Sequence, residues 1–212
     1  MTGGKPGKRP ISLVQHMRDD CGMSRYHEPM PKADTLPATR EAAVLFAAKF
    51  AGAAERLLRS HLEGQPDDPV AWMMLLELLH FTGKRQEFDE SAQAFSTAFG
   101  RPAPAWGFPE PVRSSGTFEL VGTIAANANL EGLVPHARAR STVAIDMSRV
   151  VRIEFAFAAT LREALRLFHH QGKRVILANI AEIHAALLES LGPMDYLVLL
   201  RRSRGEYLAI AA

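Results

Sequence analysis

The stretch from Ala144 to Leu167, A-I-D-M-S-R-V-V-R-I-E-F-A-F-A-A-T-L-R-E-A-L-R-L, decides the fold of the chain around it. Its start belongs to an apolar run over 142–147, which predicts a central strand that is buried on both faces. From Glu154 to His170 apolar residues recur every three or four positions, which predicts a helix. The inner stripe of this helix consists of Phe157, Leu161, Leu165 and Phe168.

The same alternation of strand and helix continues on both sides of this stretch. Strands are predicted over 118–122, 175–178 and 196–200, and a further helix over 181–191. A short helix around Leu133 is expected after the first strand, with Asn127 or Asn129 as its cap. This alternation predicts an α/β layer with parallel, right-handed crossovers, covered by helices on at least one face.

In its order and spacing, the chain from Thr117 to about Arg202 resembles a STAS domain, the module of bacterial anti-sigma-factor antagonists and of certain transporter subunits. The resemblance implies an α/β domain with a mixed sheet and helices on one face. It rests on Gly122 after the first strand, Ile145-Asp146-Met147-Ser148 followed by Glu154, Gly172-Lys173 before a strand, and Leu191-Gly192 before the last strand.

The resemblance implies a regulatory position at the start of the helix after Glu154. In partner-switching members a Ser or Thr directly follows an acidic residue there, and its phosphorylation breaks a complex by adding negative charge. Here Phe155 stands in that position, and Phe157 stands where the family often has Gly. The resemblance therefore implies a docking module without the phosphorylation switch, in which no phosphate is expected on Phe155, Ser148 or Thr160. The expected docking face comprises Ser148, Arg152, Glu154 and Phe155.

The two phenylalanines cannot both face the core, because they lie about 200° apart around a helix. Phe157 shares the stripe of Leu161 and is expected to be structural. Phe155 either anchors a protein interface near the exposed helix start or packs against Val151 or Ile153. Ser148 has an equally simple interpretation as a turn or capping hydroxyl.

Helices are also predicted between Thr39 and Trp106, before the α/β region. Thr39 is expected to cap the first helix and Gly52 to end it, whereas Asp68 and Pro69 open the third. Gly52 and Gly83 lie 31 residues apart, close to the tetratricopeptide period of about 34. The predicted domains are therefore a helical-hairpin domain with degenerate tetratricopeptide-like repeats over 39–100 and a STAS-like domain over 117–202.

The segments outside these two predicted domains are rich in proline, glycine or polar residues. Residues 1–38 lack periodicity and are interpreted as a disordered tail, and 203–212 as a C-terminal tail. The proline-rich segment 101–116 is expected to be a stiff linker. Within it Trp106 and Phe108 are expected to cover the joint between the domains.

Composition and charge bear on the classes of partner, compartment and cofactor that the protein is expected to have. A net charge of +2 over 212 residues gives no argument for nucleic acid, and the single cysteine suits the reducing cytosol. No apolar run is long enough to span a bilayer, so we expect a cytoplasmic protein without direct membrane insertion, associated with a membrane only through a partner. His16, Cys21 and His27 match no compact zinc spacing, and no metal or other cofactor is expected.

We find no pattern of catalytic residues. The chain has no glycine-rich phosphate loop, H-E-x-x-H or C-x-x-C motif. His169 and His170 are adjacent and point about 100° apart on a helix, where they favour its dipole. His184 has no carboxylate partner on its own helix face. The sequence therefore predicts no enzymatic activity.

The resulting hypothesis is a non-catalytic adaptor that binds a protein partner constitutively. The resemblance implies two kinds of partner: the ATPase of a lipid-handling ABC transporter, or an anti-sigma factor or regulatory kinase. The missing hydroxyl favours the transporter. A third hypothesis is a scaffold whose helical half binds peptides of an envelope or secretion assembly. The STAS-like half would then serve as a dimerisation unit, so a homodimer is among the expected assemblies.

Overall fold

Four helices precede a four-stranded sheet in the part of the chain that the computed structural model describes, which is residues 37–107, 116–125 and 132–202. The chain from Leu36 onward forms one compact unit. The predicted N-terminal tail up to residue 36, the C-terminal tail, Phe108, Asn127 and Asn129 lie outside the described residues.

The predicted helical region is confirmed. Neighbouring helices along the chain pack against each other, and the first also contacts the third. Whether these hairpins are tetratricopeptide-like repeats stays a prediction. The helices are α1 (Ala38–Ala47), α2 (Ala51–Gly64), α3 (Pro69–Phe81) and α4 (Arg85–Phe99).

Side-chain capping was predicted correctly for α3 and wrongly for α1. The carboxylate of Asp68 accepts hydrogen bonds from the backbone N–H groups of Val70 and Ala71, at 2.9 and 3.1 Å, and Pro69 is the first helical residue. Thr39 does not cap α1, because the helix begins one residue earlier, at Ala38. No side chain among the described residues caps α1, and the carbonyl of Pro37 accepts the hydrogen bonds of the Arg40 and Glu41 N–H groups.

The break between α1 and α2 lies three residues before the predicted one. Gly52 is inside α2, and Lys49 makes the reversal with a φ of 71°. A side chain in this left-handed region costs roughly 1 kcal/mol, so surrounding contacts have to hold it there. One of these contacts is an ion pair from Lys49 to Glu154.

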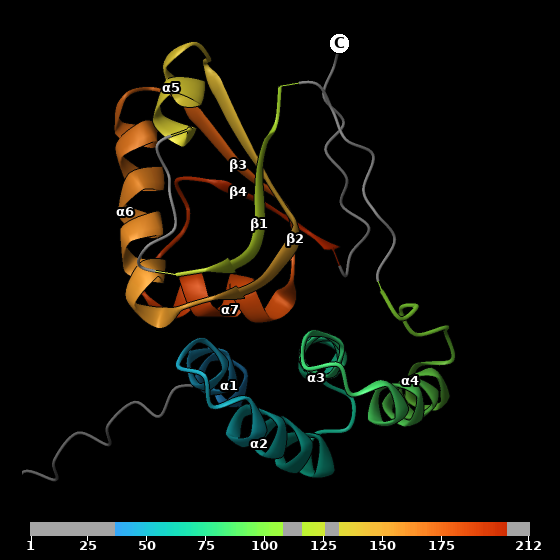
Figure 1. Ribbon diagram of the computed structural model, residues 1–212. Helices are drawn as coiled ribbons and strands as arrows, with labels where there is room; N and C mark the ends of the chain where they lie inside the picture. Colours follow the sequence, from blue (N-terminus) through green and yellow to red (C-terminus); the bar gives the residue numbers. More distant parts are fainter. Residues whose placement is uncertain (1–36, 108–115, 126–131, 203–212) are drawn as a thin grey trace, which may run out of the picture. The chain divides into compact units, whose positions relative to one another are not determined.

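The α/β region has four parallel strands in the order in which they follow along the chain. The α/β class is confirmed, but the mixed sheet was wrong, because all described strand pairs are parallel. Right-handed crossovers in one direction leave the helices on the same side of the sheet (Figure 1). The elements are β1 (Phe118–Ile124), α5 (Leu133–Arg138), β2 (Thr142–Ile153), α6 (Phe155–His170), β3 (Arg174–Ile180), α7 (Glu182–Ser190) and β4 (Val198–Arg201).

The central strand β2 is twice as long as the predicted strand over 142–147. It continues to Ile153, so Ser148 lies within a strand, and the predicted turn or capping position of its hydroxyl was wrong. The second half pairs with β1, where Gly122 lies opposite Val150 and Ile124 opposite Ile153. The second half of β2 mixes apolar and charged residues, so its sequence alone does not predict a strand. Its pairing with the edge strand β1 makes it one.

The core lies between the sheet and α6. The predicted inner stripe is confirmed, since its four side chains are at most 4 % exposed. Val143, Ile145 and Met147 of β2 face them and are completely buried. With roughly 2 kcal/mol for each fully buried large aliphatic side chain, this layer is a main source of stability.

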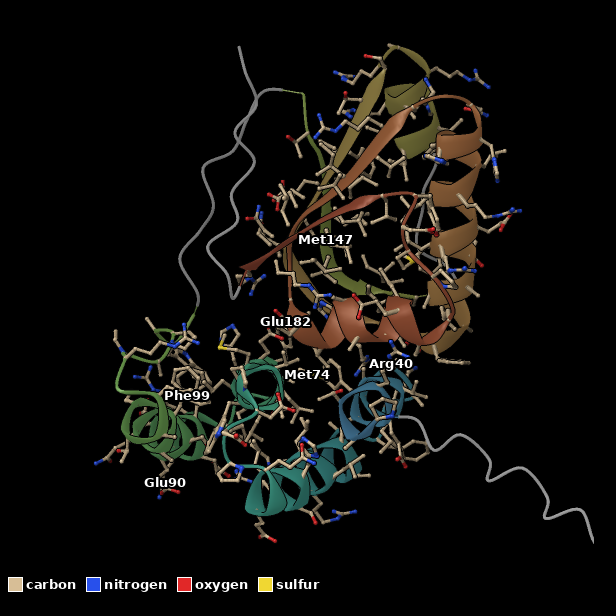
Figure 2. The ribbon with its side chains drawn as sticks, turned by 180° about the vertical axis from the view of Figure 1, so that it is seen from behind. Arg40, Met74, Glu90, Phe99, Met147 and Glu182 are labelled. Carbon is tan, nitrogen blue, oxygen red and sulfur yellow. The ribbon has the colours of Figure 1, made fainter. Side chains whose placement is uncertain are left out.

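The helical region packs on α7, where α1 and α3 cover its outer side. In Figure 2, Met74 of α3 and Glu182 of α7 mark the two sides of this contact, and both are buried. Trp106 packs edge-on against His80 and Phe88, of α3 and α4, so the described contacts place it on the helical region. The domain boundary within 101–116 stays a prediction.

Candidate functional site

The start of α6 is the first candidate site, and the structure places it where the sequence predicted. Glu154 is the residue before the helix, its N–H donates to the carbonyl of Ile124 at 2.8 Å, and Phe155 is the first helical residue. Phe155 is 44 % exposed, whereas Phe157 is buried as expected. The strand leads directly into the helix, so the ring position is fixed by the sheet.

Two further exposed apolar residues are connected to this helix start, one through the chain and one through an ion pair. The side chain of Phe50 is 61 % exposed, and that of Val151 is 41 % exposed. Phe50 is brought to α6 by its neighbour Lys49, whose ammonium lies 2.8 Å from the carboxylate of Glu154. We call Phe50, Val151 and Phe155 the aromatic corner. Sequence reasoning missed Phe50, because only the fold joins the turn between α1 and α2 to the end of β2.

The other predicted docking residues have different environments. Arg152 is half-buried near the end of β2, and its Nε makes no hydrogen bond with a described residue. Ser148 lies seven positions before Phe155, and the strand between them spans roughly 17 Å. The structure therefore separates Ser148 from the helix start, and its part in docking stays a prediction.

Ser148 belongs to a polar group at the middle of β2. The carboxylate of Asp146 accepts hydrogen bonds from the N–H and hydroxyl of Ser148, at 2.9 and 3.1 Å, and from the side-chain amide of Asn179, at 2.9 Å. Asn179 has a left-handed backbone, with φ of 56°, at an irregularity of β3. These bonds satisfy a buried carboxylate, so the hydroxyl of Ser148 has a structural role within the strand in place of the predicted turn or capping role.

A second polar group, which the sequence did not indicate, joins α3 to the start of α7. The completely buried carboxylate of Glu77 accepts hydrogen bonds from the N–H groups of Glu182 and Ile183, both at 3.0 Å. No side chain of α7 caps its own start. Glu77 thus caps a helix 105 residues away, and its negative charge suits the positive end of that helix dipole.

Burial sets the ionisation of this group. It raises the pKa of Glu77 to about 7, although the two N–H groups and the nearby Arg202 act in the opposite direction. A pKa near 7 would suit a general base. However, Glu77 is completely buried and both its oxygens accept backbone hydrogen bonds. The arrangement therefore favours a structural role.

His184 occupies the same contact between the helical region and α7. Its ring stacks on Phe81 at 5.3 Å between centroids and lies 6.5 Å from the Phe46 ring. Burial and the charge of Arg202 lower the pKa of His184 to about 3, which the Val151 carbonyl partly opposes. Neither ring nitrogen makes a hydrogen bond of normal geometry with a described residue, so the neutral ring acts as an aromatic packing group.

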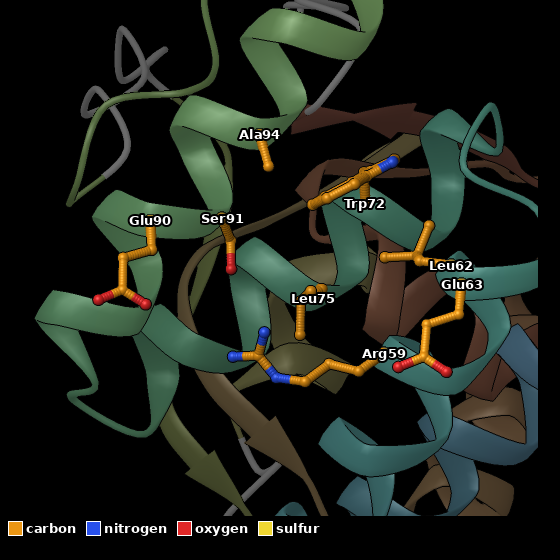
Figure 3. Close-up of a pocket in the computed structure, with 8 residues that line it drawn as sticks. All are labelled: Arg59, Leu62, Glu63, Trp72, Leu75, Glu90, Ser91 and Ala94. Atoms are coloured by element: carbon orange, nitrogen blue, oxygen red, sulfur yellow. The ribbon is translucent and has the colours of Figure 1, made fainter.

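A groove of about 330 Å³ lies between α2, α3 and α4 and is the second candidate site (Figure 3). Its apolar wall combines Leu62, Leu75 and Trp72, and Arg59 extends toward the middle of the opening. The indole N–H of Trp72 donates to the carbonyl of Pro66 at 2.8 Å, which fixes the ring. The remaining lining residues are Glu63, Glu90, Ser91 and Ala94.

The described residues contain no group of three or more His, Cys, Asp or Glu side chains placed to hold a metal ion, and His16, Cys21 and His27 lie outside them. Within the same residues, no helix is both long and apolar enough to cross a bilayer. No protein-family model matches the chain, and no curated protein or solved structure is similar enough to count as a match.

Proposed function

We propose that this protein is a non-catalytic adaptor that holds a protein partner against the aromatic corner. The observation that carries the proposal is the position of Phe155, which is exposed and is the first residue of α6. No hydroxyl stands there to be phosphorylated, so binding is constitutive. Large aromatic side chains supply much of the binding energy in protein interfaces.

The corner is ready for binding without rearrangement. Phe155 is held by the junction of β2 and α6, and Phe50 by the reversal at Lys49. A rigid surface loses little conformational entropy when a partner binds, so more of the contact energy appears as affinity. The ion pair between Lys49 and Glu154 is largely exposed and contributes less than about 1 kcal/mol, so it serves to position the corner.

The alternation of strands and helices supports a STAS-like interpretation of the α/β region, although its described strands form a parallel sheet and not the mixed sheet that the resemblance implies. Asp146 and Ser148 of β2, and Glu154 before α6, occupy the order that carries the resemblance. On this interpretation the partner is the ATPase of a lipid-handling ABC transporter, because a STAS subunit of such a system binds without a phosphate cycle. An anti-sigma factor or regulatory kinase is the alternative partner.

The proposal is tested by affinity capture of full-length protein from its native cell, followed by mass spectrometry and binding measurements with the purified partner. We expect a transporter ATPase to bind the wild type and to bind Phe155→Asp at least about 30-fold more weakly, the effect of losing one hot-spot side chain. Leu167→Asp is the matched control, because Leu167 is also an exposed apolar residue of α6 but lies three turns away.

Each outcome of this capture has a distinct meaning. Recovery of an anti-sigma factor or kinase through the same residue selects the alternative partner. Undiminished capture by Phe155→Asp removes the aromatic corner from the interface. Incubation with ATP and candidate kinases should leave Ser148 and Thr160 unmodified, and phosphate on either residue would contradict constitutive binding.

The groove between α2, α3 and α4 favours a second candidate function, a scaffold that binds an extended peptide. Its apolar wall suits an aliphatic side chain, and Arg59 at the opening, whose Nε already binds the carboxylate of Glu55 at 3.0 Å, can offer its Nη groups to a peptide carboxylate. In this case Ala94→Trp, at an exposed lining residue, should fill the groove and abolish capture, whereas Phe155→Asp should leave it unchanged. Circular dichroism would show that Ala94→Trp is still folded.

A further inference from the structure

Basic side chains gather at the end of the sheet where the strands begin. Arg138 is the last residue of α5 and Arg140 follows it, whereas Lys173 precedes β3 and Arg174 is the first residue of that strand. Two hydrogen bonds join these segments: Lys173 Nζ donates to the carbonyl of Arg140 at 2.8 Å, and the N–H of Arg174 donates to the carbonyl of Ser141 at 2.9 Å. We call these four cations the basic edge.

The charge of the basic edge is largely uncompensated. No carboxylate among the described residues forms an ion pair with any of its four side chains. Asp195 lines the same open cleft of about 390 Å³ as Lys173 and Arg174, and His169 adds a further nitrogen base there. The nearby carboxylate of Glu163 is already bound by Arg166.

Exposed aliphatic side chains stand on the two helices that lead into these cationic segments. Val134, four residues before Arg138 on α5, is 45 % exposed, and Leu167, in the last turns of α6, is 53 % exposed. Cations next to exposed aliphatic groups match a membrane surface, where phosphates bind the cations and the interfacial region accepts apolar side chains.

We propose that the basic edge binds the anionic phospholipid headgroups of a membrane surface. Single-stranded nucleic acid fits less well, because it is bound through exposed aromatic side chains that stack on the bases, whereas Tyr196 of the cleft is half-buried and its hydroxyl donates to the carbonyl of Arg162 at 3.4 Å. The exposed phenylalanines of the described residues, Phe50 and Phe155, belong to the aromatic corner at the opposite end of α6. That helix has 16 residues and is about 24 Å long, so lipid and partner can bind at the same time.

Vesicle sedimentation tests this proposal with the full chain. We expect the protein to sediment with vesicles of phosphatidylglycerol and phosphatidylcholine and to remain in solution with phosphatidylcholine alone. Arg138 and Arg174 are both exposed, so reversing their charge should preserve the fold. Arg138→Glu with Arg174→Glu should weaken binding by at least about 25-fold, from a contribution of roughly fivefold for each cation.

The matched control reverses two exposed cations elsewhere, Arg40→Glu with Arg56→Glu on α1 and α2, which changes net charge equally. It should retain most of the binding. Leu167→Asn should weaken binding severalfold if aliphatic groups enter the lipid. Raising the salt concentration should also weaken it, because the charges are exposed.

Three results would overturn the proposal. The first is no binding to anionic vesicles at low salt, and the second is an equal loss in the control and test variants. The third is binding to single-stranded RNA, lost with Arg138→Glu and Arg174→Glu, in the absence of vesicle binding. None of these bears on partner capture through Phe155, so the two proposals fail separately.

Discussion

Helices α6 and α7 begin in two different ways, although each follows a parallel strand and neither start is capped by a side chain of its own. The helical region reaches both starts. Lys49 binds Glu154 at the exposed start of α6, whereas Glu77 caps the buried start of α7. The difference leaves one helix start exposed, where we propose that a partner binds, and makes the other a buried contact within the same packed unit.

Burial is the physical cause of this difference. Around the start of α7, α1 and α3 exclude water, so each polar group there needs a partner within the protein. At the start of α6 water solvates Lys49, and Phe155 keeps an exposed ring. We therefore expect substitutions at α7 to change the free energy of unfolding and substitutions at α6 to change binding.

The largest expected effect is a reversal of the pH dependence of stability. In Glu77→Gln the remaining His184 has a pKa lowered from 6.5 to about 3, so the unfolded state binds more protons between these values. Stability should then rise as the pH increases across this range. In His184→Phe the remaining Glu77 has a pKa raised from 4.5 to about 7, so stability should fall with increasing pH between these values.

Both slopes should approach about 1.4 kcal/mol per pH unit and have opposite signs, because each reports one proton. Urea unfolding between pH 4.5 and 6.5 would measure these slopes. In the wild type the free energy of unfolding should change little over this range, because the contributions of Glu77 and His184 compensate. Both variants keep the other titratable groups around Glu77 and His184, which are Arg202, Arg201, Glu182 and His80. If the two variants gave slopes of the same sign, Glu77 and His184 would not have the opposite pKa shifts on which this prediction depends.

A smaller effect should separate the two helix starts at constant pH. Glu77→Ala should reduce the free energy of unfolding by about 2 kcal/mol, because two buried N–H groups of α7 lose their acceptor. Lys49→Ala should change it by less than about 1 kcal/mol, because its ion pair is exposed. Chemical denaturation at pH 8 would compare the variants, and equal losses would mean that both starts are structural.

The smallest effect concerns the ion pair itself. A double-mutant cycle with Lys49→Ala and Glu154→Ala should give a coupling energy of about 0.5 kcal/mol. Because both side chains are accessible to salt, the coupling should disappear at about 1 M ionic strength. A coupling that persists in high salt would show that the pair is more buried than its exposed lysine indicates.

Local patterns predicted the extent of both α6 and α7, but not the residues of other helices that pack at the start of α7. The inner stripe of α6, its start and the cap of Asp68 on α3 all follow from residue spacing within a single element. The break at Lys49 was missed because the expected residue, glycine, stands three positions later. The length of β2 was missed because pairing with β1 provides hydrogen bonds that no local pattern reveals.

One residue of the sequence indicated the contact between α3 and the start of α7. Glu77 stands within the apolar run M-M-L-L-E-L-L of α3, and a carboxylate in so apolar a helix requires a partner. The sequence alone does not say that this partner is the start of a helix 105 residues away. The sequence pattern relates His184 only to residues on its own helix face. Its ring neighbours in the structure are Phe81 and Phe46, which belong to other helices.

The amino-acid sequence by itself determined the α/β alternation, the helical hairpins and the absence of a hydroxyl at the start of α6. These depend on periodicity and on the identity of one residue, both of which are local. Tertiary structure alone decided that Lys49 ties the turn that carries Phe50 to the start of α6, that Glu77 caps α7, and that four cations share one edge of the sheet. Each of these combines residues from separate segments, and only packing and burial bring them within reach of one another.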